Sequence, residues 1–168
     1  SEGDDLFYSN GTDSGRITGG LWYPLGLETP LAPNLSVIGG GLLAGQYQVG
    51  VTYTNTATGE ESGISPCSVI TLSSTGGIRV TLPGASAGAT HVNIYLTDNQ
   101  GSALIWLAQV AAGAATYDAI ALPLGREHNG QTEYPLPVGS LFMSNGRLCS
   151  FNGKTLYVGS AWRYGYYS

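Results

Sequence analysis

The sequence predicts an all-β protein whose central part is a β-sandwich, and three observations support this. Apolar and polar residues alternate along much of the chain, as they do in half-buried strands. Clusters of Pro, Gly, Asn and Ser separate these rows at a spacing of roughly ten residues, which is typical of a sandwich or barrel. Helical periodicity is nearly absent, since the one Ala-rich stretch, Ala108 to Ala115, contains Gly113 and is apolar on two faces at once.

The central segment, residues 33–122, is predicted to form the sandwich. In four rows, every second residue is apolar and is expected to point into the core. Trp106 belongs to the fourth row, so we expect it in the core or between the sheets. The rows are Tyr47, Val49, Val51 and Tyr53; Ile78, Val80 and Leu82; Val92, Ile94 and Leu96; and Leu104, Trp106, Ala108 and Val110.

Two further segments flank the predicted sandwich. Residues 1–32 contain a short hairpin around Asn10-Gly11 and an extended stretch from Tyr23 to Pro30, and residues 123–168 contain a connector and then a meander. Asn-Gly pairs at Asn145-Gly146 and Asn152-Gly153 favour type I′ turns, because both central residues of that turn take positive φ. These two turns predict three short strands between Val138 and Val158. Hairpins at both ends of the chain suggest a sandwich inserted into a repeating, propeller-like β-array.

The composition excludes several classes of function. The 168 residues suit one domain with short appendages, and eleven acidic against six basic residues give a net charge of −5. Nucleic-acid binding needs a basic surface, so we expect none. Only 10% of the residues are charged, against about 25% in an average protein, while Gly (26) and Tyr (11) are abundant. A sparsely charged surface of this kind indicates one that other protein subunits cover.

Membrane insertion and secretion are not indicated either. The charge-free stretch between Glu28 and Glu60 is rich in Gly, Asn and Gln and interrupted by prolines, so it does not form an apolar span of about 20 residues. No signal peptide opens the chain, and Ser1 in place of Met suggests processing or a fragment. Cys67 and Cys149 fit neither a metal spacing nor a disulfide framework, so we expect two free, buried thiols.

Two motifs match phosphate-binding patterns only in part. Gly39 to Ala44 (GGGLLA) contains the glycines of a dinucleotide fingerprint, but the strand predicted from Gln46 to Thr54 follows where a helix must begin. Gly153-Lys154-Thr155 matches the end of a phosphate-binding loop, but Leu148 stands where that loop needs a glycine. We therefore predict no cofactor.

The remaining polar motifs do not predict an enzyme. Asp98 to Gly101 (DNQG) would bind calcium weakly at most, because no acidic residue closes a 12-residue loop, and a turn between strands is the better interpretation. Glu60 and Glu61 are adjacent, so their side chains point in opposite directions and cannot flank one bond. His91 and His128 have no partners at a spacing that suggests a triad. We predict no catalytic residue and no metal site.

Aromatic residues gather outside the predicted sandwich and form the candidate interface. Side chains with an apolar body and a polar tip suit protein interfaces, and they also serve as sugar-stacking platforms, so both interpretations stay open. The last residues stop in the middle of an aromatic pattern, so we expect the natural polypeptide to continue past Ser168. The candidate interface residues are Trp22, Tyr23, Trp162, Arg163, Tyr164, Tyr166 and Tyr167.

The central segment resembles a fibronectin type III domain. Residues 46–65 (QYQVGVTYTNTATGEESGIS) resemble the penultimate strand of that fold and the turn after it, and Cys67 to Leu72 would be its final strand. The next rows, from Ile78 to Asp118, resemble its early strands. Because the late strands come first, the resemblance implies an immunoglobulin/fibronectin III-like sandwich that is circularly permuted.

Across nearly the whole chain, the order of motifs resembles a family of tailed-bacteriophage virion proteins that carry such a sandwich within a β-propeller-like body. The resemblance implies a tail-associated nozzle, neck or tail-tip part, assembled in the host cytoplasm as a homo-oligomeric ring that contacts other tail or neck subunits. A second hypothesis is an adhesion module that binds host glycan. The motifs are LFYSNG from Leu6, YQVGVTY from Tyr47, GEESG from Gly59, NIYLT from Asn93, NGRL from Asn145, LYV from Leu156 and RYG from Arg163.

Overall fold

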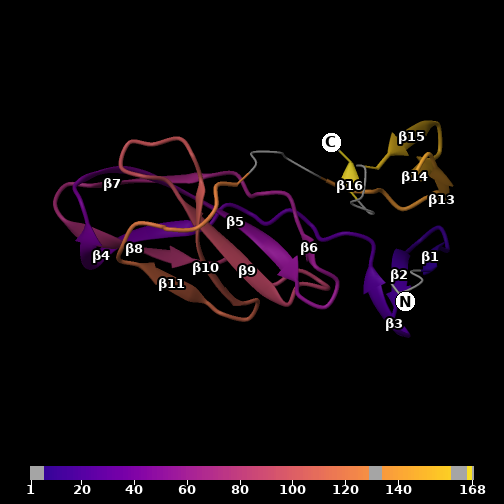
Figure 1. Ribbon diagram of the computed structural model, residues 1–168, viewed down its shortest axis with the longest axis horizontal. Coiled ribbons are helices and arrows are strands. Elements are labelled where there is room, and N and C mark those ends of the chain that lie inside the picture. Colours follow the sequence, from indigo (N-terminus) through magenta and orange to yellow (C-terminus); the bar gives the residue numbers. More distant parts are fainter. Residues whose placement is uncertain (1–5, 129–133, 160–165, 168) are drawn as a thin grey trace.

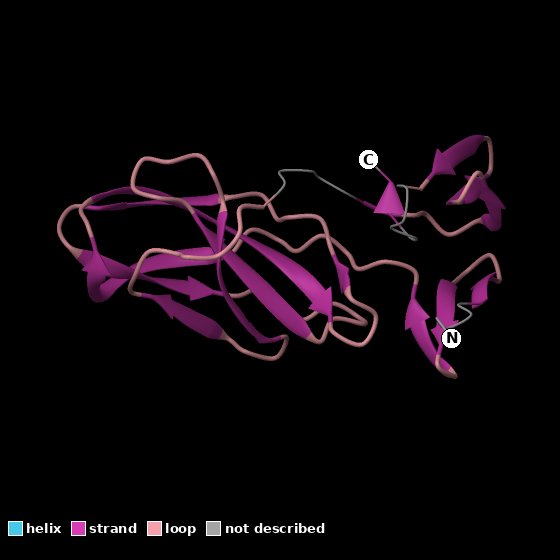
Figure 2. Cartoon of the chain, in the orientation of Figure 1, coloured by secondary structure: helices cyan, strands magenta, loops and turns pink. Residues whose placement is uncertain are grey.

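The computed structural model describes residues 6–128, 134–159 and 166–167, and every regular element among them is a β-strand. Figure 2 shows these strands joined by loops and turns. The predicted all-β, sandwich-type fold is confirmed, while its fibronectin III-like type and its circular permutation stay predictions. Figure 1 places the sandwich at one end of the molecule and the terminal strands at the other.

The sandwich consists of two antiparallel sheets. One sheet has the order β10-β9-β5-β6, with β7 paired to the same strand β5, and the other has the order β11-β8-β4. The strands are β4 (Asn34–Leu42), β5 (Gly45–Asn55), β6 (Glu60–Glu61), β7 (Ser68–Leu72), β8 (Gly76–Thr81), β9 (His91–Leu96), β10 (Ile105–Ala111) and β11 (Thr116–Ala119).

Alternation along these strands produces the sandwich core. Residues on β5 and β9 face residues on β8 across the gap between the sheets, and all of the first three predicted rows are buried. Val51, Ile94 and Ile78 have no exposed surface, for example. The core consists of Leu27, Leu42, Tyr47, Val49, Val51, Tyr53, Leu72, Ile78, Val80, Leu82, Val92, Ile94, Leu96 and Ala119.

The fourth predicted row is confirmed at Val110 but wrong at Trp106, because β10 contains an irregularity between Trp106 and Ala108. An extra residue at a bulge shifts the strand by one position and so reverses which side chains face the core. As a result, Leu107 and Val110 pack against the core, whereas Trp106 pairs with Tyr95 on the outer face of the sheet.

The glycine run that resembles a dinucleotide fingerprint lies within β4 and lets two strands approach closely. A Cβ atom on Gly40 would lie 2.7 Å from the carbonyl oxygen of Gly76, and one on Gly77 would lie 2.8 Å from that of Gly39. No helix follows the run, since β5 begins at Gly45. Its glycines therefore serve the contact between β4 and β8.

The terminal segments form small antiparallel sheets beyond one end of the sandwich (Figure 1). The N-terminal sheet contains the expected hairpin and also a third strand that the sequence did not predict. The predicted meander between Val138 and Val158 is confirmed. The strands are β1 (Leu6–Ser9), β2 (Ser14–Thr18) and β3 (Leu21–Pro24) in the first sheet, β13 (Ser140–Ser144), β14 (Arg147–Asn152) and β15 (Thr155–Val158) in the meander, and β12 (Tyr134–Pro135), which pairs with β16 (Tyr166–Tyr167).

The two turns of the meander differ in type. Asn145 and Gly146 both have positive φ, of 50° and 72°, as the predicted type I′ turn requires. In the second turn, Asn152 pairs with Thr155, so the central residues are Gly153 and Lys154, and only Gly153 has positive φ. The type I′ prediction is therefore wrong there, because Asn152 ends the strand instead of opening the turn.

The two thiols also differ. Both cysteines are free, and Cys149 is buried in β14, but Cys67 is exposed just before β7, so the prediction of two buried thiols is wrong for Cys67. The contacts of its sulfur atom nevertheless remove enough water to raise the pKa of the Cys67 thiol.

Candidate functional site

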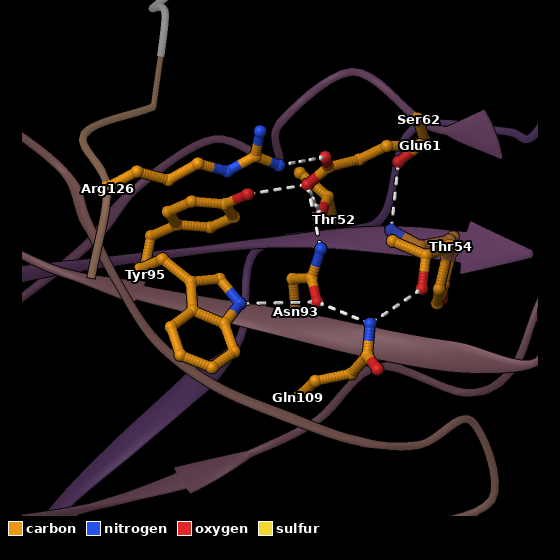
Figure 3. A network of polar contacts seen from close by, with 10 residues as sticks. Thr52, Thr54, Glu61, Ser62, Asn93, Tyr95, Gln109 and Arg126 are labelled. Carbon is orange, nitrogen blue, oxygen red and sulfur yellow. Dashed lines mark hydrogen bonds and ion pairs between the residues drawn. The ribbon is translucent and has the colours of Figure 1, made fainter. Parts of the chain in front are cut away.

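A network of polar side chains covers the outer face of the sheet that contains β5, β9 and β10. At its centre, one carboxylate oxygen of Glu61 accepts hydrogen bonds from Tyr95 Oη (2.5 Å), Thr52 Oγ1 (2.7 Å) and Asn93 Nδ2 (2.9 Å). Figure 3 shows these three donors converging on Glu61 from two strands. The other carboxylate oxygen lies 3.3 Å from Nη2 of Arg126.

The network extends toward β10 through Asn93. Its side-chain oxygen accepts hydrogen bonds from Gln109 Nε2 (2.9 Å) and Trp106 Nε1 (3.4 Å), and Gln109 also donates to Thr54 Oγ1 (3.3 Å; Figure 3). Neighbouring strands therefore share a continuous chain of donors and acceptors. A buried polar group is costly unless it is paired, and this arrangement pairs each of these groups.

These contacts shift the acidity of the two central groups in opposite directions. Burial alone raises the pKa of Glu61, but the hydrogen bonds from Tyr95, Thr52 and Asn93 and the charge of Arg126 outweigh it, so the pKa is lowered overall. The pKa of Tyr95 is raised, first by burial and then by its hydrogen bond to the Glu61 carboxylate and the charge of that group. At neutral pH the pair is thus a phenol donating to a carboxylate.

Two adjacent carboxylates hold two different parts of the chain. Glu61 contacts Arg126 of the connector, whereas Glu60 lies 3.5 Å from Nη1 of Arg16 in β2. Arg16 also donates a hydrogen bond to the carbonyl oxygen of Thr58 (3.2 Å) and is almost completely buried. As the sequence predicted, the adjacent carboxylates point apart, and this lets the short strand β6 bind both terminal segments.

The connector also adds backbone pairing to the edge of β10. The amide of Trp106 donates to the carbonyl oxygen of Arg126 (2.8 Å), and that of His128 donates to Leu104 (2.7 Å). The ring of His128 lies edge-to-face with Tyr95, at 4.9 Å between centroids. His128 therefore packs against the network.

Serine side chains complete the other edge of β5, where β6 and β7 leave a gap. The hydroxyl oxygen of Ser62 accepts the amide of Tyr53 (2.9 Å), and that of Ser65 accepts the amide of Val51 (3.0 Å). The amides of the two serines donate back to the carbonyl oxygens of Tyr53 and Val51, at 2.9 Å each. These hydroxyls replace the carbonyl groups that a regular strand would supply.

The terminal sheets share a second, much smaller core. Leu25, after β3, packs with Leu136 and Leu148, so the N-terminal sheet and the meander meet through their apolar residues. Partly buried side chains from both segments surround these three, namely Phe7, Leu141 and Tyr157.

The opposite face of the meander carries a group of large apolar side chains that are partly exposed. Cross-strand pairing places Phe142, Cys149 and Val158 on one face, together with Phe151 and Leu156. We call Phe142, Phe151, Leu156 and Val158 the meander outer face. Their exposed fractions are 44%, 46%, 52% and 47%, while Cys149 between them is buried.

The structure describes four of the predicted interface residues, Trp22, Tyr23, Tyr166 and Tyr167. Trp22 and Tyr23 are neighbours in β3, and their cross-strand partners Ile17 and Arg16 place them on opposite faces of the sheet. Trp22 is 53% exposed, and Tyr23 is partly buried. Tyr166 and Tyr167 form β16, and Trp162, Arg163 and Tyr164 lie outside the described residues.

The remaining candidate motifs are turns. In DNQG, the amide of Gly101 donates to the Asp98 carbonyl oxygen (2.9 Å) and Asn99 Nδ2 donates to that of Ala44 (2.8 Å), so the segment closes the connection between β9 and β10. Gly153-Lys154 is the tight turn of the meander. Among the described residues, no group of three or more His, Cys, Asp or Glu side chains could hold a metal ion. The described part of the chain also contains no helix long and apolar enough to span a membrane.

The comparisons with known proteins add no relative: no family model matches the chain, and no curated protein sequence matches it.

Sequence reasoning considered Glu60 and Glu61 only as catalytic acids and therefore missed their structural role. The alternation of Asn93 and Tyr95 with core residues could have shown that both lie on the outer face of β9. No local signal pairs them with Glu61 or Arg126, because those contacts join residues that are far apart in sequence. The meander outer face, in contrast, could have been read from its strands and turns.

Proposed function

We propose that this chain is a structural component of a tailed-bacteriophage virion, in the tail or neck, and that it acts through protein–protein contacts with copies of itself and with neighbouring subunits. The observation that carries the assembly role is the meander outer face, where four large apolar side chains on one sheet remain about half exposed. The assignment to a phage virion and its tail is supported by the resemblance in motif order from Leu6 to Gly165.

The exposed apolar side chains of this face argue that another subunit covers it. A three-stranded sheet normally packs one face on a core and turns a polar face to water. In the meander, Leu148 and Tyr157 already supply the packed face, so the apolar residues on the other side call for a second layer. A subunit docked there would remove four large side chains from water.

The sandwich differs from the meander because polar side chains on the outer faces of its two sheets bond to one another. The network around Glu61 covers one sheet, and Arg79 and Asp118 form a two-pronged ion pair on the other, with both distances 2.7 Å. The proposed role of the sandwich is therefore that of a spacer or decoration, and the terminal sheets carry the subunit contacts.

The experiment measures the mass of the purified chain by size-exclusion chromatography with light scattering. We expect a ring of several copies, and we expect Leu156→Glu to shift it toward the monomer, because a carboxylate in a buried contact is costly. Val37→Glu is the matched control, since Val37 is 60% exposed on β4 of the sandwich. A wild-type monomer at tens of micromolar, or an assembly that survives Leu156→Glu, would contradict the assembly role.

The place in the virion needs a separate measurement. Antibodies raised against the chain should label the tail or neck in negatively stained virions of the source phage. Labelling of the capsid shell, or of no part of the virion, would reject the tail assignment without affecting the assembly measurement.

A further inference from the structure

Beyond the proposed structural role, we propose that a cleft beside Trp22 binds a neutral oligosaccharide. The cleft has a volume of about 440 Å³, which lies in the range of small-molecule sites. Four parts of the chain line it: residues 12–14 at the start of β2, β3 with the residues that follow it, the loop at Ser86 and Ala87, and residues 135–138. Junctions between separately packed parts are common places for ligand sites.

Trp22 supplies a flat apolar surface that is fixed before any ligand arrives. A Cβ atom on Gly15 would lie 2.4 Å from Trp22 Nε1 and 2.9 Å from Cε1 of Tyr8, so the two rings flank the space that the missing side chain leaves. The indole is held against the sheet in this way and still exposes 53% of the residue. Pro24 and Pro137 extend the apolar lining.

Carboxylates supply the polar part of the cleft. Asp13 and Glu28 line it, both are exposed, and neither carboxylate has a hydrogen-bond or ion-pair partner among the described residues. An ionised carboxylate only accepts hydrogen bonds and can take two adjacent donors, as vicinal sugar hydroxyls offer. Serine and threonine hydroxyls lie in the same lining, at Thr12 and Ser86.

The charge of the lining selects among ligands. No Lys, Arg or His is among the lining residues, so sulfated, phosphorylated or sialylated sugars would meet two carboxylates without a counter-charge. A basic peptide would be attracted only weakly, because exposed carboxylates are well screened by water and salt. A ring with an apolar C–H face and several hydroxyls fits both the indole and the acceptors.

The test screens the wild-type chain on an array of neutral, sialylated, sulfated and phosphorylated glycans, and then titrates the strongest neutral binder by calorimetry. We expect neutral glycans to be preferred. Trp22→Ala should weaken binding about tenfold or more, and Asp13→Asn and Glu28→Gln about tenfold each, as expected for lost hydrogen bonds to a charged group. Gly15→Ala should also weaken it, because the added methyl group displaces the indole.

Two controls keep the test decisive. Leu21→Ala removes an apolar side chain that is 62% exposed on the opposite face of β3 and should leave binding unchanged. Trp22→Tyr keeps a ring and should retain part of the affinity. The proposal is overturned if no neutral glycan binds, if anionic glycans are preferred, if a hexa-arginine peptide binds in their place, or if Trp22→Ala binds as well as the wild type.

Discussion

The sandwich and the terminal sheets consist of the same kind of alternating strand, but different side chains occupy their outer faces. In the sandwich, fourteen buried residues form the core, and side chains such as Glu61 and Asp118 close the outer faces with polar contacts. In the terminal sheets, three buried residues form the core, and the meander outer face stays apolar and exposed. The sandwich combines a large core with polar contacts on its outer faces, and the terminal sheets combine a small core with a group of exposed apolar side chains on one face.

The largest expected effect separates the two cores. Ile94→Ala leaves a cavity in the sandwich core and should lower the free energy of unfolding by about 2–5 kcal/mol. Chemical denaturation with hydrogen exchange measures both the size and the extent of the loss. We expect exchange to increase in the sandwich and in the terminal sheets, because the terminal sheets depend on the sandwich to bring their strands together.

Leu148→Ala is the matched change in the small core. It should increase exchange in β13–β15 and leave the amides of β5 and β9 protected. If Leu148→Ala also increased exchange in β5 and β9, the conclusion that the sandwich core is stable without the small core would be wrong.

The next effect concerns the hydrogen bonds to Glu61 on the outer face of the sandwich. Glu61→Ala leaves Thr52, Asn93 and Tyr95 without their shared acceptor and should cost about 3 kcal/mol in the free energy of unfolding. Glu61→Gln keeps an acceptor oxygen and should cost less. Equal losses in the two variants would indicate that the charge, and not the hydrogen bonding, carries the contribution.

The same residue predicts a pH dependence. Because the pKa of Glu61 is lower in the folded chain than its ordinary value of 4.5, its carboxylate stabilises the fold above that value. The contribution is lost as the pH falls from about 4.5 through the folded pKa. Measured from neutral pH downward, the stability difference between wild type and Glu61→Gln should therefore shrink below pH 4.5, and a difference that grows on acidification would contradict the sign.

A smaller effect is expected at the edge of β5. Ser65→Ala removes the acceptor of the Val51 amide, a buried hydrogen bond, and should cost about 1–2 kcal/mol in denaturant titrations. Ser36→Ala is the control, since Ser36 is exposed on β4. A Ser65 variant as stable as the Ser36 variant would show that water replaces the hydroxyl.

The smallest effect is expected for the exposed ion pair. Asp118→Ala breaks both contacts to Arg79, whose side chain is 48% exposed, and should leave the midpoint of thermal unfolding almost unchanged. If Asp118→Ala destabilised the chain as much as Glu61→Ala does, the polar contacts on the two outer faces of the sandwich would contribute equally to stability.

The sequence predicted the parts of the fold that depend on local pattern. The rows through Val49, Val80 and Ile94 identified three core strands, because alternation alone fixes which side chains share a face. The fourth row failed at Trp106 and held at Val110, since a bulge between them changes the period and leaves no composition signal. The contacts of Glu61 were beyond prediction for another reason, because they join three strands and a connector that only the folded topology brings together.

The small core also sets an order of events during folding. Phe7 and Tyr157 surround the same three residues, although nearly the whole chain separates them in sequence. Closing so long a loop in an unfolded chain is entropically costly and slow, but a folded sandwich holds Leu27 in its core and Glu127 beside β10, which leaves only short tethers to close. During synthesis, the N-terminal strands must therefore wait, with Phe7 and Leu25 uncovered, until residues 136–157 have left the ribosome. That interval is when exposed apolar side chains make this chain most prone to aggregate.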